Sequence, residues 1–328
     1  MLTLATVLSA HAHLAAGFDW VIFFQQIEIG ITTGAMYALV ALGYTMVYGI
    51  IELINFAHGD IFMWATVIIF VLLGPLKIAA PPSNFFALIG LMLLLLIVGM
   101  AVSGTLNFTL ERLVYRRLRK APRLAPLIAA VGASFILETV AQIWRGSGQV
   151  AFPTIFPTDT IDIGGVNGVK IAWLDIFVVL VAVGLMVGLD RFIRLTKIGR
   201  AMRATAQDPE AASLMGVNVN RTISLTFAIG GALAGAAALF YNLEIGNVWY
   251  LTGFQLGLIA FTAAVLGGIG NIYGAVFGGF MIGLVSTLAI QYVPNGTSWS
   301  LAIVFGILVL TLTVRPSGLL GQQVPDKV

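Results

Sequence analysis

The residues best placed to do chemistry form one polar cluster, the string NFAHGD that begins at Asn55. Asn55, His58 and Asp60 bring an amide, an imidazole and a carboxylate together, with Phe56 and Gly59 between them. Polar and ionisable side chains are costly inside a bilayer and commonly mark a substrate or ion pathway. The pattern therefore predicts a break between two helices that lines a gate. The alternative is a plain helix break with no such role.

Two further carboxylates, Glu28 and Glu138, fall inside apolar runs and are candidates for the same pathway. The competing interpretation is burial against a neighbouring helix or extension to the membrane interface. Enzyme chemistry is not indicated, because no nucleophile lies beside a base as an intramembrane hydrolase would need. The chain has no cysteine, and its three histidines fit no familiar metal-site spacing. We therefore expect neither catalytic residues nor a metal site.

A second motif is a short helix with signals at both ends, from Asp208 to Gly216. Asp208 can accept hydrogen bonds from free backbone N–H groups, Pro209 suits the first helical position, and Glu210 places negative charge in the first turn. Gly216 suits the position just past the helix end. A helix specified this tightly suits docking into a soluble protein; an interfacial helix that only orders a loop is the alternative. Its other residues are Ala211, Ala212, Ser213 and Leu214.

The composition is that of a membrane protein with several crossings. Hydrophobic residues make up 59% of the 328 residues, charged residues only 9%, and mean hydropathy is +1.00, whereas soluble domains carry about 25% charged residues. Runs that suit a membrane helix of about 20 residues lie at 27–51, 85–108, 125–144, 172–190, 222–243, 272–292 and 299–314. Two shorter runs, 61–73 and 254–270, are either full crossings or re-entrant helices. We expect an all-α bundle of about eight or nine transmembrane helices, some broken or re-entrant, within 21–321.

Basic residues predict how this bundle is oriented. Loops 109–124 and 190–221 each hold six Lys or Arg, and the tail holds Arg315 and Lys327, which together are 14 of the 17 in the chain. Because cytoplasmic loops carry such an excess, we expect both loops, the capped helix and the C-terminus in the cytoplasm. The segment 146–171 then lies outside. The net charge of +3 is a topology signal, and no nucleic-acid-binding motif accompanies it.

Three segments lie outside the predicted helices. Residues 160–171 alternate in polarity around the glycine-rich turn 164–168, which predicts a small external β-hairpin. The N-terminal segment 1–20 is interpreted as either signal-like or interfacial, because 1–16 loosely resembles a cleavable signal sequence without the usual basic start. An external N-terminus fits nine crossings and a cytoplasmic tail at 322–328.

Glycines concentrate in the second half of the chain. Pairs spaced by four residues let helix backbones approach closely in lipid. The string GGIGNIYG at 267–274 looks superficially like a phosphate-binding loop, but no Lys-Ser/Thr pair follows it and no soluble strand precedes it. No Walker-type sequence occurs in the chain, so we expect no ATP hydrolysis by the chain itself. The glycines expected at helix contacts are Gly231, Gly235, Gly267, Gly268, Gly270, Gly274 and Gly278.

Four strings resemble the LivH-type permease subunit of branched-chain amino acid ABC importers. They are GYTMVYGII at 43–51, INFAHGD at 54–60, AFTAAVLGGIG at 260–270 and RPSGLLG at 315–321. The resemblance covers the chain from about residue 20 to its end. Two positions depart from the family pattern: relatives carry Glu where this chain has Asp60, and Pro is common where it has Tyr273.

The resemblance implies a bacterial inner-membrane permease that pairs with a second, LivM-like permease. It also implies two cytoplasmic ATPases and an external, periplasmic amino-acid-binding protein as partners, so that ATP is used by the partners and this chain needs no cofactor. In such importers a cytoplasmic loop helix sits in a cleft of each ATPase, and 208–216 matches that position. Closure of the ATPase pair would push this helix and switch the pore between its two access states. A zwitterionic substrate with an apolar side chain needs no deeply charged site, which agrees with the low charge of the spans.

Two other transporter types remain compatible with the residues alone. A sister branch of the same permeases carries urea or short amides. An ion-coupled secondary transporter is of a different class, because it would need its own coupling-ion site and could work without an ATPase. Dependence of transport on ATP or on an ion gradient distinguishes the two classes.

Overall fold

The computed structural model describes residues 19–119, 121–122, 124–165 and 168–321. The expectations for the signal-like segment 1–16 and the tail 322–328 lie outside these residues. So do Lys120 and Arg123 of the first basic loop and two residues of the predicted hairpin turn.

The described chain is a helical bundle, as the sequence predicts. Eight helices are long and apolar enough to cross a membrane. They are α2 (Trp20–Ile51), α3 (His58–Leu76), α4 (Phe85–Leu110), α6 (Leu124–Arg145), α7 (Trp173–Leu195), α10 (Val219–Ile245), α12 (Ile272–Tyr292) and α13 (Gly296–Val314). A π-helical turn, η1 (Glu111–Tyr115), and α5 (Arg116–Leu118) prolong α4.

The two shorter apolar runs behave differently from each other. The run at 61–73 becomes α3, a helix of 19 residues that tolerates Pro75 in its last turn. The run at 254–270 becomes α11 (Thr252–Gly267), which has only 16 residues. It ends because Gly268 takes a positive φ of +106°, a conformation that few residues other than glycine adopt.

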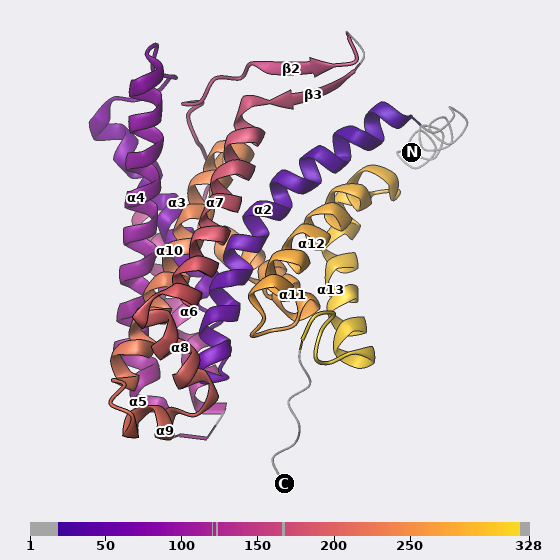
Figure 1. The fold of residues 1–328 in the computed structure, drawn as a ribbon. Coiled ribbons are helices and arrows are strands. Elements are labelled where there is room, and N and C mark those ends of the chain that lie inside the picture. The colour runs from indigo at the N-terminus through magenta and orange to yellow at the C-terminus, as the bar shows by residue number, and fades with distance from the viewer. Residues whose placement is uncertain (1–18, 120, 123, 166–167, 322–328) are drawn as a thin grey trace.

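Helices α2 and α10 form the centre of the bundle. They are the most buried of the spans, whereas α6 and α13 are the least buried. Figure 1 shows α2 running obliquely between a group that includes α4, α7 and α10 and a second group of α11, α12 and α13. Its longest contacts are with α12 and α10, and α10 packs along α4. The lipid-facing helices therefore enclose a core built on α2 and α10.

Small residues make these contacts close. A Cβ on Gly231 or Gly235 would collide with the backbone of α4, and one on Gly278 would collide with the backbone of α11. Gly267 and Gly274 likewise meet backbone to backbone where α11 packs on α12. These five glycines lie at helix contacts, as the spacing predicts.

The prediction is wrong for Gly268 and Gly270, which do not lie on helix faces. Gly268 caps α11 with φ +106°, and Gly270 has φ +94° in the turn before α12. The four-residue spacing of Gly270 and Gly274 is therefore not a helical one. Both glycines are used for turn geometry that a side chain would strain.

Short elements lie at the two ends of the bundle. At one end, β2 (Thr160–Ile163) and β3 (Val169–Ala172) form the predicted antiparallel hairpin. Nearby, β1 (Val150–Ala151) pairs with β4 (Asn247–Val248), an unpredicted link between segments far apart in sequence. The other end carries α5, α8 (Lys197–Gln207) and α9 (Pro209–Leu214) (Figure 1). The segment expected as a loop at 190–221 is thus mostly helical, because α7 continues to Leu195 and α8 follows directly.

Candidate functional site

The N-terminal end of α9 is capped as the sequence predicts. The Asp208 side chain accepts hydrogen bonds from the backbone N–H groups of Glu210, at 2.9 Å, and Ala211, at 3.0 Å. Pro209 occupies the start of the helix, where its missing N–H costs nothing. Two of the donors that a helix leaves free at this end are therefore satisfied locally.

The C-terminal end of α9 is closed by glycine. Gly216 has φ +84°, and its N–H donates to the Ser213 carbonyl while the Val217 N–H donates to the Ala212 carbonyl, both at 3.0 Å. This pair of bonds is the Schellman arrangement. With both ends fixed by local hydrogen bonds, α9 is a compact element whose shape does not depend on a partner.

One side of α9 is open and apolar. Leu214 is 88% exposed and Met215 is 85% exposed, and Ala211 is exposed beside them. Ala212, in contrast, is buried against the rest of the chain. Of the two alanines of α9, only Ala211 is open to contact with another molecule. Adjacent exposed apolar side chains at the end of a membrane protein suit a protein contact.

Helix α8 joins α9 to the membrane helix α7. The Thr196 hydroxyl caps α8 by accepting a hydrogen bond from the Gly199 N–H at 3.0 Å, and Arg203 donates to the Ile193 carbonyl near the end of α7. Gly199 lies directly on the backbone of Ile193, where a Cβ would collide. The sequence interpretation missed α8, although Thr196 before a helix-forming run was an available N-cap signal. Helices α7 and α8 are therefore joined by a short, closely packed connection.

The polar cluster forms a helix break in the bundle core. Asn55 lies in the turn before α3, while His58 and Asp60 belong to its first turn. Asn55 is 1% exposed and the other two are fully buried. The predicted break is therefore present. In this conformation its polar side chains are packed between helices.

Helix α11 covers this break. A Cβ on Gly59 would collide with the Gly253 carbonyl of α11, so the two backbones touch. The Phe56 ring lies 6.0 Å from that of Phe261, also on α11, between ring centroids. The shortest of the apolar helices thus lies against the break.

The His58 ring packs against helices α2 and α4. It stands edge-on to Tyr44 of α2 at a centroid distance of 4.8 Å, and it lies against Gly43 of the same helix. Its Nδ1 is 3.5 Å from the Asn107 amide nitrogen of α4. Glycine at position 43 provides the space that the imidazole occupies.

Asn55 links the break to α4 and η1. Its amide group donates to the Asn107 side-chain oxygen at 3.0 Å, and its own oxygen accepts from the Tyr115 hydroxyl at 3.1 Å. Asn107 also donates to the Phe227 carbonyl of α10 at 2.7 Å. Because buried polar groups are stabilised only when hydrogen-bonded, this chain of contacts fixes the relative positions of three helices. Asn107 and Tyr115 were not singled out from sequence, although an Asn inside an apolar span was a visible signal.

Asp60 points toward a different helix from His58. Its carboxylate accepts a hydrogen bond from the Ser134 hydroxyl of α6. Glu138, one turn further along α6, is near enough to interact electrostatically with Asp60. The structure therefore brings together two of the predicted pathway carboxylates at the contact between α3 and α6.

Glu28 lies apart from this group. It accepts a hydrogen bond from Gln25 at 3.1 Å and lies near Asp175 at the start of α7, beside the hairpin. Gly43, which touches His58, comes 15 residues after Glu28 on α2. At the rise of an α-helix, this spacing separates the two residues by about 22 Å along the helix axis. Glu28 therefore lies at the hairpin end of the bundle, well away from the polar cluster.

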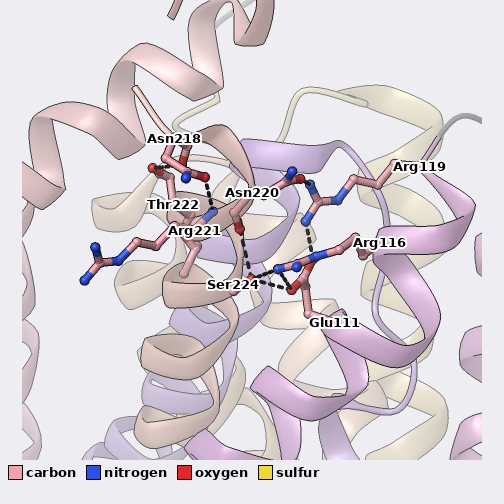
Figure 2. A network of polar contacts seen from close by, with 9 residues as sticks. Glu111, Arg116, Arg119, Asn218, Asn220, Arg221, Thr222 and Ser224 are labelled. Carbon is pink, nitrogen blue, oxygen red and sulfur yellow. Dashed lines mark hydrogen bonds and ion pairs between the residues drawn. The ribbon is translucent and has the colours of Figure 1, made fainter. Parts of the chain in front are cut away.

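A buried ion-pair network joins the two basic segments (Figure 2). Glu111 of η1 is fully buried and accepts hydrogen bonds from Arg116, at 3.3 Å, from Arg119, and from the Ser224 hydroxyl of α10, at 2.5 Å. Arg119 also donates to the Asn220 side chain of α10 at 2.7 Å. Partial burial lowers the pKa of the Arg119 guanidinium, while Glu111 raises it. From the sequence, Arg116 and Arg119 indicated only the membrane orientation. In the structure they also hold η1 and α10 together through Glu111, Ser224 and Asn220.

The described residues contain no group of three or more His, Cys, Asp or Glu arranged to hold a metal ion. The arrangement instead offers two kinds of feature. One is a packed polar break at the centre of a membrane bundle, and the other is a rigid helix with an exposed apolar side at its end.

Comparison with known proteins agrees with this description. The family described as "Branched-chain amino acid transport system / permease component" matches residues 26–312. Similar relatives include the high-affinity branched-chain amino acid transport system permease proteins BraD of Pseudomonas aeruginosa, 39% identical, and LivH of Salmonella typhimurium and Escherichia coli, 38% and 37% identical. Each comparison covers 93% of this chain and 98% of the relative. No solved structure matches the chain.

Proposed function

Since this chain belongs to the family of branched-chain amino acid transport system permease components, we propose that it lines the route by which an ATP-driven importer moves an aliphatic amino acid across the membrane. The chain is a permease with several membrane crossings. The relatives are named for branched-chain amino acid transport, which supports the class of leucine, isoleucine and valine as substrates of this chain. The scarcity of charge in the spans suits a zwitterion with an apolar side chain.

The observation that carries the ATP-coupled mechanism is the exposed side of α9. A docking helix needs a fixed shape and an apolar contact, and α9 has closed ends and the exposed pair Leu214 and Met215. We assign this surface to a cytoplasmic ATPase subunit, with one such subunit for this permease and one for a second, LivM-like permease. The ATPases then use the ATP, because no nucleotide-binding motif occurs in this chain. An external amino-acid-binding protein would meet the opposite end, where the hairpin lies.

The polar break is the proposed gate. Asn55, Phe56, His58, Gly59 and Asp60 lie between α2, α4, α6 and α11, with Glu138 beside Asp60. Rearrangement of α11, which lies against the break, would expose these polar side chains to a passing substrate. Glu28, at the hairpin end, would belong to the external entrance.

The same proposal fixes the orientation. The end that carries α5, α8 and α9 faces the cytoplasm of a bacterial cell, and the described chain ends on that side after α13. The concentration of Lys and Arg in 109–124 and 190–221 supports this.

A reconstitution experiment tests the function. The permease is purified with its co-purifying subunits, placed in proteoliposomes, and assayed for uptake of labelled leucine and of labelled urea. We expect leucine uptake that requires ATP and persists when ion gradients are collapsed. Uptake of urea instead of leucine, or uptake driven by a gradient without ATP, would contradict the proposal.

A further inference from the structure

A basic cavity opens beside the Glu111 network at the end of the bundle that carries α9. It has a volume of about 490 Å³ and lies between the end of α4 and the start of α10. Arg112 and Arg116 line it from η1 and α5, and Arg221 lines it from α10. Phe108 and Leu225 provide an apolar wall. The cavity thus combines positive charge with an apolar side at a membrane boundary.

The three arginines that line this cavity differ in whether they have an acidic partner. Arg116 is committed to Glu111 and Ser224, as Figure 2 shows. Arg112 and Arg221 are exposed, and neither forms an ion pair with an acidic side chain among the described residues. Figure 2 shows the Arg221 side chain extending away from Glu111. Two positive charges in the cavity are therefore left without a counter-charge from the described chain.

The surroundings indicate where a counter-charge would come from. The Arg112 guanidinium lies over the Phe108 ring, 5.6 Å from its centroid, which holds it at the side of α4. Leu113, next in sequence, is 58% exposed, so η1 also presents an apolar side chain to its surroundings. Basic pockets between membrane helices at the cytoplasmic side are suited to anionic lipid headgroups. A planar guanidinium can bind two oxygens of one phosphate.

We propose that this cavity binds the phosphate group of an anionic phospholipid, with Arg112 and Arg221 as its ligands. The acyl chains would lie along the apolar wall formed with α4 and α10. The site is separate from the polar break and from the exposed side of α9. Because Asn218, which caps α10, also lines the cavity and follows α9 by only a few residues, a bound lipid would stabilise the start of α10 next to α9.

Spin-labelled lipids test this site directly. The full chain is reconstituted in phosphatidylcholine vesicles containing a trace of spin-labelled phosphatidylglycerol or of spin-labelled phosphatidylcholine, and the motionally restricted fraction of each is measured. We expect a preference for phosphatidylglycerol that falls about fivefold for each arginine removed and is lost in the Arg112→Gln, Arg221→Gln double variant. The matched control, Arg117→Gln with Arg200→Gln, removes two exposed arginines of the same end and should keep the preference.

Two further arms separate the explanations. Arg112→Lys with Arg221→Lys keeps both charges, so most of the preference should remain; a loss equal to that of the glutamine variant would mean altered packing and would overturn the proposal. Inorganic phosphate, compared with chloride at equal ionic strength, should not displace the labelled phosphatidylglycerol. Selective displacement that requires Arg112 and Arg221 would show a soluble-anion site instead of a lipid site. An equal loss in the matched control would show general surface charge and would likewise overturn it.

Discussion

Gly43 of α2 lies directly against the imidazole of His58, so that a Cβ at position 43 would overlap the ring nitrogen. The same Cβ would come within 2.8 Å of the Gly230 carbonyl oxygen of α10. The position of the His58 ring therefore depends on the absence of a side chain one helix away. This contact links the polar break to the two central helices of the bundle.

The Gly43→Ala variant should consequently be destabilised. Overpacking of a filled core costs about 1 to 3 kcal/mol, and here the neighbour is a ring enclosed on several sides. Gly49→Ala is the matched control on the same helix, because its Cβ would make only an ordinary contact of 3.5 Å. The thermal unfolding midpoint of the purified permease should fall for Gly43→Ala and stay near wild type for Gly49→Ala. Equal midpoints for the two variants would show that the close packing at His58 is not realised.

The gate assignment predicts a separation of transport from assembly. His58→Ala removes the ring from the break, and Asp60→Asn replaces its carboxyl group with an amide of similar size. We expect each to reduce leucine uptake more than it reduces the amount of assembled complex, measured by co-purification of the subunits. Wild-type uptake in both variants would contradict the gate assignment and would mean that the polar cluster is only a break between two helices.

The Glu111 network predicts a large effect on stability. Glu111→Gln leaves Arg116 and Arg119 without their counter-charge. Breaking a fully buried pair costs about 3 to 5 kcal/mol, and we expect less than this because the two arginine side chains are 31% and 18% exposed. Arg117→Gln, an exposed arginine of the same segment, serves as control and should change little. Midpoints of thermal unfolding in detergent measure both. A Glu111→Gln protein as stable as the control would mean that the ion pairs do not hold η1 to α10.

The proposed orientation can be tested by thiol labelling, because the chain has no cysteine. Asp162 lies exposed on the hairpin strand β2, and Ser213 lies exposed on α9. Asp162→Cys should react with a membrane-impermeant thiol reagent in cells whose outer membrane is permeabilised. Ser213→Cys should react only after the inner membrane is opened, and less when an ATPase is bound. Labelling of Ser213→Cys across an intact inner membrane would reverse the orientation.

Most of the bundle could be predicted from apolar run length, because a membrane helix needs little more than a long apolar stretch. What run length could not decide was the extent of α11, which depends on the positive φ of Gly268. The four-residue spacing of Gly270 and Gly274 gave a wrong prediction of a shared helix face. Gly270 lies in the turn before α12 and Gly274 lies within α12, so the two residues do not belong to one helix. The strand pair β1 and β4 was not predictable, because each strand has two residues and nothing local specifies its partner.

The candidate sites were predictable in part. The capped helix α9 was predicted because its signals are local: Asp208, Pro209 and Gly216 act within a few residues of one another. The polar cluster was recognised from its composition, but its partners Asn107 and Tyr115 come from another helix and become visible only once the helices are packed. Glu111 was overlooked because it stands among basic residues, where charge near a helix end ordinarily indicates topology.

The central claim, that α9 couples this permease to an ATPase, is tested most directly by substituting its two exposed apolar residues. Leu214→Asp with Met215→Asp removes the apolar contact and leaves the capping residues Asp208, Pro209 and Gly216 unchanged. The conservative Leu214→Met with Met215→Leu variant is the matched control. The measurement is ATP-driven leucine uptake in proteoliposomes, with the co-purifying ATPase quantified for each variant. We predict that the aspartate variant loses uptake and ATPase together while the control keeps both. Wild-type uptake and ATPase binding by the aspartate variant would contradict the account.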